Sequence, residues 1–248
     1  DFPLPPLQIQ KAIVKKLDKL SHLIELRKES IKKTENLTKS IFIEMFGDPM
    51  LNEKGWEIEK LWKVSNVGSS TRVFTKDLVE KWIPFYRWGE ISSLSDWKKV
   101  KSKLFISEEH YNKIIRRVKV PIIWDLLLPS ICPNGDIWQV NTEKPFYFKD
   151  GRVLWIHLNN PKLDWTYLRF LLKEMFIYNY SKISSWTTFS ELKIFILKDL
   201  IIPLPLIDIQ KKFAAIFKMN EENIARQKDS LVKLEELYTS EMQESFSF

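Results

Sequence analysis

The sequence predicts an α+β protein in which a mixed globular domain is flanked by two long α-helices that pair with each other. Three observations lead to this prediction. A proline-rich phrase occurs twice, each copy is followed by a long stretch without Gly or Pro, and the segment between these stretches consists of short apolar runs separated by turn residues.

The repeated phrase is FPLPPLQIQK at 2–11 and IPLPLIDIQK at 202–211. Proline fixes the backbone φ angle and lacks an amide donor, so each phrase predicts an extended connection after which a helix begins. The similarity continues at a constant offset of 200 residues, as between Ile24 and Ile224. Similarity at a fixed spacing indicates an internal repeat.

Each phrase introduces a predicted helix of about 40 residues, because Gly and Pro are absent from Leu7 until Gly47 and from Leu206 to Phe248. Apolar residues recur on both helices with the 4-3 spacing of a seam that needs a partner helix. The seam residues are Ile13, Leu17, Leu20, Ile24, Ile31 and Ile41 in the first helix, and Phe213, Phe217, Ile224, Leu231, Leu234 and Tyr238 in the second. In the first helix the seam is interrupted by Arg27, Thr34 and Thr38. The other helix is the obvious partner. The alternative is two surface helices that each lie on a globular core.

The middle segment carries the excess positive charge of the chain, whose formal net charge is +7. Residues 50–200 contain 24 Lys or Arg against 17 Asp or Glu, and the flanking segments together contain 15 of each. All ten Trp residues also lie in the middle segment. We therefore expect a first helical segment at 1–48, a basic globular domain at 49–200 and a second helical segment at 201–248.

Strands and helices alternate irregularly in the predicted globular domain. Runs rich in β-branched and aromatic residues predict strands at 82–88, 117–124, 136–140, 144–148 and 152–158. An apolar face predicts a helix at 164–180 with Asp164 as its cap, and a shorter helix is predicted from Ser190 to Leu197 with Ser190 as its cap.

Three Trp residues and one His in these strands are expected to stabilise the fold rather than to bind or catalyse. Trp88, Trp124 and Trp155 are expected in the core because they lie in predicted strands. His157 is expected to be packed or hydrogen-bonded rather than catalytic.

Composition argues against several classes of protein. The single Cys132 excludes an internal disulfide and a cysteine zinc cluster, and three dispersed histidines argue against a histidine metal site. No apolar run is long enough to cross a bilayer and a signal peptide is absent, so we expect no membrane association and a cytoplasmic location. Glycine-rich phosphate loops, paired carboxylates and methyl-transfer motifs are missing, which predicts no catalytic residue, no metal and no cofactor.

Several loops combine hydroxyl residues, cations and aromatic rings, as surfaces that contact nucleic acid do. Hydroxyls and amides suit phosphate oxygens, and Arg can bind a guanine edge through two hydrogen bonds. The candidate DNA-binding residues are Ser69, Ser70, Thr71, Arg72, Arg87, Trp88, Lys98, Lys99, Lys101, Lys103, Arg116, Arg117, Lys182, Ser184, Ser185, Trp186, Thr187 and Thr188. For any single basic run, a solvated surface is the competing interpretation.

Three passages together resemble the specificity subunit of type I restriction–modification enzymes. They are FPLPPLQIQK, then MFGDPMLNEKGWEIEKLWKVSNV at 45–67, and SSWTTFSELKIFILKDLIIPLPLIDIQ at 184–210. The resemblance implies a non-catalytic subunit that reads double-stranded DNA through a target recognition domain. It also implies partners: a DNA methyltransferase (modification) subunit and, through it, a restriction subunit.

The family's subunit normally has two recognition domains and two spacer helices, whereas this chain has one domain between two helices. It therefore looks like the C-terminal half of a longer subunit or a naturally half-size one, which could form a homodimer and read a palindromic target. The resemblance implies an antiparallel helix pair, which at about 1.5 Å per residue is roughly 60 Å long and sets the spacing of two half-sites.

By their positions in the resembling family, the loops at 68–72, 87–90 and 184–188 are the best-supported DNA contacts. The basic runs at 98–103 and 116–119 are candidates because of their charge alone. Two alternatives remain open. One is a coiled-coil assembly adaptor with a basic protein-binding domain, and the other is a cryptic nuclease.

Overall fold

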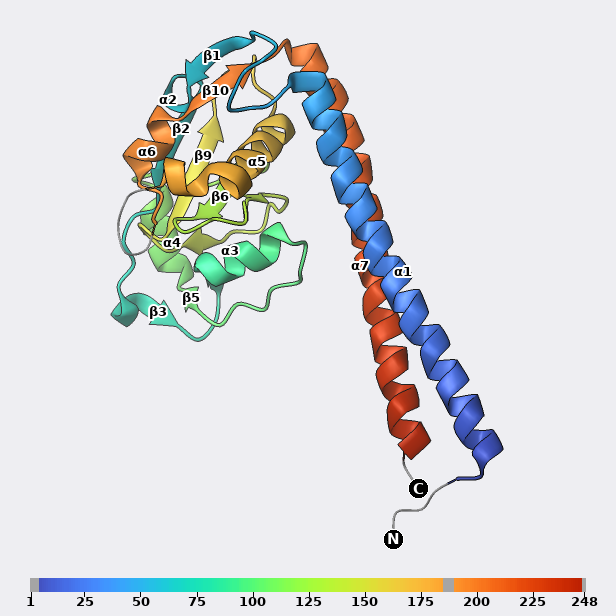
Figure 1. The fold of residues 1–248 in the computed structure, drawn as a ribbon. Coiled ribbons are helices and arrows are strands. Elements are labelled where there is room, and N and C mark those ends of the chain that lie inside the picture. Colours follow the sequence, from blue (N-terminus) through green and yellow to red (C-terminus); the bar gives the residue numbers. More distant parts are fainter. Residues whose placement is uncertain (1–4, 185–189, 247–248) are drawn as a thin grey trace. The chain divides into compact units, whose positions relative to one another are not determined.

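The computed structural model describes residues 5–184 and 190–246 and divides into two compact units (Figure 1). The helical unit consists of Asp1–Glu44 and Ala215–Phe248, and the globular unit is Met45–Ala214. Within the described ranges, no helix is both long enough and apolar enough to span a membrane.

Two helices of 40 residues each, α1 (Leu7–Phe46) and α7 (Ile207–Phe246), supply the helical unit. They run side by side in opposite directions (Figure 1). Each starts directly after its proline phrase, where proline can no longer interrupt the backbone hydrogen bonds. The predicted lengths and the predicted antiparallel pairing are both confirmed.

The seam between α1 and α7 follows the predicted 4-3 spacing, but it is not purely apolar. Leu20, Ile24 and Ile31 are buried, whereas the flanking positions are exposed. Three polar residues are buried with them, namely Thr38, Asn220 and Gln227. Ion pairs that join the two helices, Lys16 with Glu241 at 2.5 Å and Lys28 with Glu235 at 3.7 Å, fix the antiparallel direction.

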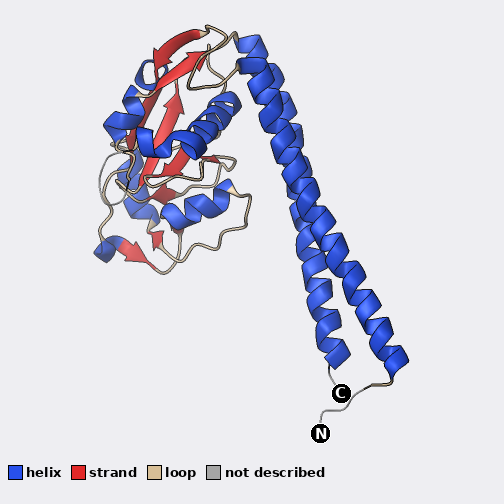
Figure 2. Ribbon diagram, viewed as in Figure 1, coloured by secondary structure: helices blue, strands red, loops and turns tan. Residues whose placement is uncertain are grey.

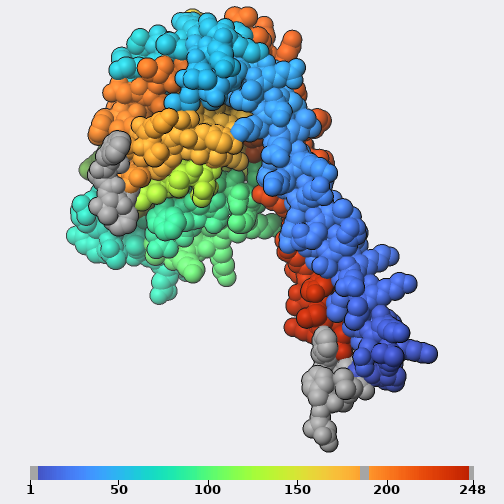
Figure 3. Space-filling model, in the orientation of Figure 1, coloured from blue at the N-terminus to red at the C-terminus, as the bar shows by residue number. Residues whose placement is uncertain are grey.

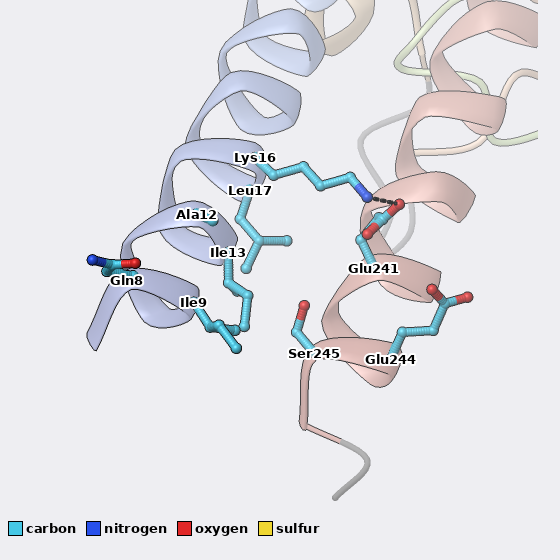
Figure 4. Close-up of a pocket in the computed structure, with 9 residues that line it drawn as sticks. All are labelled: Gln8, Ile9, Ala12, Ile13, Lys16, Leu17, Glu241, Glu244 and Ser245. Atoms are coloured by element: carbon cyan, nitrogen blue, oxygen red, sulfur yellow. Dashed lines mark ion pairs between the residues drawn. The ribbon is translucent and has the colours of Figure 1, made fainter. Parts of the chain in front are cut away.

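Near the start of α1 and the end of α7 the two helices leave a shallow hollow of about 500 Å³ (Figure 4). Ile9, Ile13 and Leu17 provide its apolar side. The ion pair between Lys16 and Glu241 crosses it, as the dashed line in Figure 4 shows.

The internal repeat is also visible in the hydrogen bonds of the two phrases. The side-chain amide of Gln10 donates to the carbonyl of Pro5 over 2.7 Å, and that of Gln210 donates to the carbonyl of Pro205 over 2.6 Å. Both bonds link residues five apart at the same offset of 200. Gln210, which is fully buried, also donates to the Lys162 carbonyl and accepts from an amide at the start of α5.

The strands of the globular unit form three small sheets (Figure 2). The first sheet pairs β1 (Glu57–Lys60) with β10 (Ile201–Leu204), which join where the chain enters and leaves the unit. The second sheet is antiparallel in the order β2 (Ser65–Ser69), β9 (Val153–Leu158), β6 (Leu126–Pro129), β7 (Trp138–Gln139). The third has the order β3 (Leu78–Val79), β5 (Phe105–Ile106), β4 (Ile83–Tyr86), β8 (Tyr147–Phe148), with β4 and β8 parallel.

Helices connect and cover these sheets. They are α2 (Leu61–Val64), the 3-10 helix η1 (Thr75–Asp77), α3 (Trp88–Ser95), α4 (Glu108–Ile115), α5 (Trp165–Ile183) and α6 (Ile194–Asp199). As predicted, Asp164 caps α5, because its carboxylate accepts from the amides of Thr166 and Tyr167. The α+β fold class is confirmed.

Two hydrophobic clusters form much of the core. One joins Ile91 of α3 to Leu127 of β6 and Trp138 of β7. The other joins Ile83 of β4 to Ile106 of β5 and lies between the third sheet and α4. The α+β arrangement therefore fixes α3, with Arg87 at its N-cap, against the second sheet.

Some local predictions are wrong. Residues 117–124 form no strand, and the strand predicted there is displaced to 126–129. The N-cap of α6 is Lys193, three residues beyond the predicted Ser190. Trp88 and Trp124 are 61% and 52% exposed instead of buried, because they lie at the first residue of a helix and in a turn rather than inside strands.

Candidate nucleic-acid interface

A turn at 149–152, here called the central turn, brings together loops that are far apart in the sequence. It connects β8 to β9, and Gly151 within it has a φ of +65°, which favours glycine. Its residues Lys149, Asp150 and Gly151 form a sequence typical of a turn.

The loop after β2 is bound directly to the central turn and its flanking strands. The Ser69 hydroxyl donates to the Val153 carbonyl over 2.6 Å and accepts from the Gly151 amide over 2.9 Å. The Ser70 hydroxyl donates to the Phe148 carbonyl over 2.6 Å. Both hydroxyls are therefore used to hold the loop, and Thr71 and Arg72 beyond it are exposed.

The loop after β4 is bound on the other side of the central turn, since the Lys149 amide donates to the Tyr86 carbonyl over 2.9 Å. Arg87 follows, and its own amide and guanidinium both contact the Glu90 carboxylate. Burial, and then the charge of Glu90, raises the pKa of Tyr86 above its usual value. Arg87 and Trp88 are exposed at the start of α3.

The segment that follows α5 meets the central turn through β6. The Ser130 amide donates to the Arg152 carbonyl, and the Leu192 amide donates to the Ser130 carbonyl. Arg152 also forms an ion pair with Glu191 at 3.4 Å. Of the predicted residues, Lys182 is exposed and Ser184 is buried, while Ser185, Trp186, Thr187 and Thr188 lie outside the described residues.

The basic run after α3 borders the second of these loops. A hollow of about 270 Å³ is lined by Gly89, Glu90 and Ser93 of α3 together with Lys98, Lys99 and Lys101. Lys98 pairs with Asp96, whereas Lys99, Lys101 and Lys103 take part in no ion pair among the described residues. Arg116 and Arg117 are exposed at the end of α4, and nothing links them to the central turn.

The structure thus joins the loops at 68–72 and 87–90 and the residues Glu191 and Leu192 around a turn that adds Lys149 and Arg152. Neither of these two cations stands out in the sequence as a candidate. Their adjacency to Asp150 and Gly151 in a predicted turn was the available signal, but only the strand pairing shows what the turn contacts.

A buried polar cluster supports β9 beside this region. The Asp125 carboxylate accepts from the Trp155 indole over 2.7 Å and lies 2.9 Å from Nδ1 of His157. That nitrogen carries the proton whenever the carboxylate is ionised. Burial raises the pKa of Asp125, and the hydrogen bond with His157 opposes the shift. His157 is hydrogen-bonded, as predicted.

Metal or thiol chemistry finds no support in this unit. Across residues 5–184 and 190–246, His, Cys, Asp and Glu side chains form no group of three that could hold a metal ion. Cys132 is buried, and burial raises the pKa of its thiol well above the usual value.

Comparisons with known proteins place the chain in a family and show related folds. The family model of the type I restriction modification DNA specificity domain matches residues 53–236. The HsdS subunit from Thermoanaerobacter tengcongensis is 19% identical with a TM-score of 0.61, and the match covers 99% of this chain and 60% of that chain. The S subunit of the type I restriction–modification system from M. genitalium is 14% identical with a TM-score of 0.62, covering 98% and 62%.

A third solved structure, described as the basis of complex assembly and conformational transition of the type I R-M system, is 21% identical with a TM-score of 0.66. The match covers 99% of this chain and 60% of that chain. The chain therefore spans about 60% of the length of the solved chains that it matches. The fold defines a class in which a mixed α/β unit is joined to an antiparallel pair of long helices. The chain belongs to the family of type I restriction modification DNA specificity domains.

Proposed function

We propose that the chain is the DNA-reading part of a type I restriction–modification specificity subunit and that it reads one half of a bipartite duplex target. The observation that carries this proposal is the convergence of these loops on the central turn. In this proposal the exposed side chains of these loops face the duplex.

In this proposal some side chains of the interface contact phosphates and others contact base edges. Lys149, Arg152 and the run at 98–103 set the position of the unit on the phosphates, which attract cations regardless of sequence. Arg72, Arg87 and Trp88 contact base edges, because a guanidinium can form two hydrogen bonds to guanine. The hydroxyls of Ser69 and Ser70 hold the loop in place.

The helical unit serves as the scaffold of the assembly. Exposed side chains on α1 and α7 bind a methyltransferase subunit, and a restriction subunit joins through it. The chain itself supplies no catalytic residue, metal or cofactor, and it works on DNA in the cytoplasm. The length of the helix pair sets the spacing of two half-sites; if the subunit is naturally half-size, a homodimer provides the second reading unit.

The deciding experiment is selection of binding sequences from a pool of random duplexes, with the chain alone and with its methyltransferase subunit. We expect one half-site motif to be enriched, and affinity to fall steeply as salt rises. Enrichment of no motif in either condition would overturn the proposal. Salt-insensitive binding to a protein would instead favour an assembly adaptor, and metal-dependent cleavage by the chain alone would favour a nuclease.

Matched substitutions locate the interface. Lys149→Ala should weaken binding and lower the slope of log affinity against log salt by about 0.9, because it removes a phosphate contact, whereas Arg87→Ala should weaken binding and relax the choice of base. Lys63→Ala is the control, because Lys63 is paired with a nearby carboxylate as Lys149 is, but it lies on α2. Equal loss of affinity in all three variants would mean that the central turn is not the site.

A further inference from the structure

The segment at 72–82 exposes two large aromatic rings that belong to no core cluster. It leaves the loop at 68–72, forms η1 and β3, and returns through Trp82 to β4. Phe74 is 52% exposed and Trp82 is 58% exposed. Figures 1 and 3 show this part of the chain, coloured teal, at the edge of the globular unit.

A cationic side chain lies close to each of the two exposed rings. The Arg72 guanidinium lies 5.2 Å from the centroid of the Phe74 ring, and the Lys76 ammonium lies 5.9 Å from it. The Lys81 ammonium lies 5.2 Å from the centroid of the Trp82 ring. Positive charge held at an exposed ring creates a surface that can contact a phosphate and a flat π-system together.

The backbone beneath these rings is fixed. Val73 and Ile83, which flank the segment, are buried in the cluster of the third sheet. The Asp77 carboxylate accepts from the Phe74 amide over 3.2 Å, and the Asp77 amide donates to the Phe74 carbonyl over 2.9 Å. The backbone on both sides of the two rings is therefore anchored to the core.

Trp82 adds a second, independent observation. Its φ is 111°, in the region that L side chains rarely adopt. Trp97 and Trp124 are also exposed with positive φ, so strain alone does not single out Trp82; Trp82 differs in lying in one segment with Phe74 and in having the Lys81 ammonium at its ring. The strain is explained if the ring is needed for binding.

We propose that Phe74 and Trp82 stack against bases of the double-stranded target and bend or unstack the duplex beside the contacts made by the central turn. This inference rests on the proposed function and adds a second mode of reading, in which sequence is sensed through the deformability of DNA. The cations Arg72, Lys76 and Lys81 outnumber the acids Asp77 and Glu80, which fits a polyanion.

The position of the segment matches a duplex. β4 leads from Trp82 at one end to Arg87 at the other, five residues later. At about 3.3 Å per residue the Cα atoms of Trp82 and Arg87 are at most roughly 16 Å apart, which is a length of about five base pairs. The aromatic segment and Arg87 are therefore close enough to lie within one duplex target.

The test uses the full chain with its methyltransferase subunit and the duplex enriched from the random pool. The variants are Phe74→Ala and Trp82→Gly, of which the second keeps the positive φ without strain. The matched control is Trp124→Gly, because Trp124 is 52% exposed and also has a positive φ, 80°, but lies in a turn outside this segment. Affinity is measured by fluorescence anisotropy, and duplex bending by energy transfer between dyes at its two ends.

We expect Phe74→Ala and Trp82→Gly each to lower affinity about tenfold to a hundredfold and to reduce the bend, while Trp124→Gly changes neither. If the wild-type chain binds its enriched duplex and both variants bind and bend it equally well, this inference is wrong and the proposed function stands. If the wild-type chain enriches no duplex, the proposed function and this inference fall together.

Discussion

Asn220 of α7 donates a hydrogen bond from Nδ2 to the hydroxyl of Thr38 on α1, over 2.9 Å and across 182 residues of sequence. Both side chains are buried in the seam of the helical unit. The Thr38 hydroxyl donates in turn to the Thr34 carbonyl over 2.8 Å. A polar pair in an apolar seam selects one register, because a slipped register would bury the same groups without partners.

The double variant Thr38→Val, Asn220→Leu should raise the melting temperature of the helix pair while it broadens the choice of register. Spin labels at exposed positions of α1 and α7 would report the register as a distribution of distances. We expect one narrow distance for the wild type and several for the variant. A single narrow distance in both would show that apolar packing alone sets the register.

Gln227 offers a simple stabilising change. Within the described residues its buried Oε1 has no hydrogen-bond partner, and an unsatisfied buried acceptor costs about 1–3 kcal/mol. Gln227→Leu should therefore raise the free energy of unfolding by about 1 kcal/mol or more, measured by urea denaturation. Glu236→Leu, at an exposed position of the same helix, is the control and should change it little.

Substitution by alanine at two glycines with the same backbone conformation should lower the free energy of unfolding by different amounts. Gly135 and Gly151 have φ of +67° and +65°, so each Ala variant incurs a backbone cost of about 1–2 kcal/mol. A Cβ at Gly135 would also lie 2.7 Å from Cγ and 2.9 Å from Cα of Lys173 on α5, whereas a Cβ at Gly151 would meet no atom within 4 Å.

Gly135→Ala should therefore lower the free energy of unfolding by about 1–3 kcal/mol more than Gly151→Ala. Thermal unfolding of the two variants side by side is the measurement. Equal losses would mean that α5 moves away from the turn without cost.

The pH dependence of stability should reveal the buried carboxyl of Asp125. Because burial raises its pKa, the folded state holds this proton more tightly than the unfolded chain does. Protonation therefore adds stability as the pH falls, and this contribution is lost as the pH rises through the folded-state pKa.

The free energy of unfolding of the wild type, relative to Asp125→Asn, should accordingly increase as the pH is lowered from 7 towards 4. Glu191→Gln should show the opposite sign, since the hydrogen bond from Lys193 lowers the pKa of Glu191 and its contribution is lost at low pH. Chemical denaturation at a series of pH values measures both. The same trend for the two variants would contradict the assignment.

The helical unit was predictable because its determinants are local and repeated. Prolines mark where α1 and α7 begin, and the 4-3 pattern marks the faces that meet. The start of α4 carried an equally local signal that was overlooked: Ser107 caps it by accepting from the His110 amide, and two Glu residues follow.

Other elements could not be predicted from the sequence of the segment that forms them. α3 ends at Ser95, and Trp97 just beyond its C-cap has a φ of 62° at a position where Gly is usual, so the sequence carries no stop signal there. Strands of two residues such as β7 and β8 are held by their neighbours rather than by their own pattern. The candidate site depends on these pairings, which is why Lys149 and Arg152 emerged only from the structure.

The heptad phase of the seam restricts how the helix pair can change in length. Inserting two residues into α1 or α7 would rotate the residues beyond them by about 200° and off the contact face, whereas seven residues added to both helices would restore every layer. Length therefore changes in steps of about 10.5 Å, close to three base pairs of duplex at roughly 3.4 Å each. Helix pairs of this kind can therefore differ in length only by discrete steps, and intermediate lengths would break the packing of the seam.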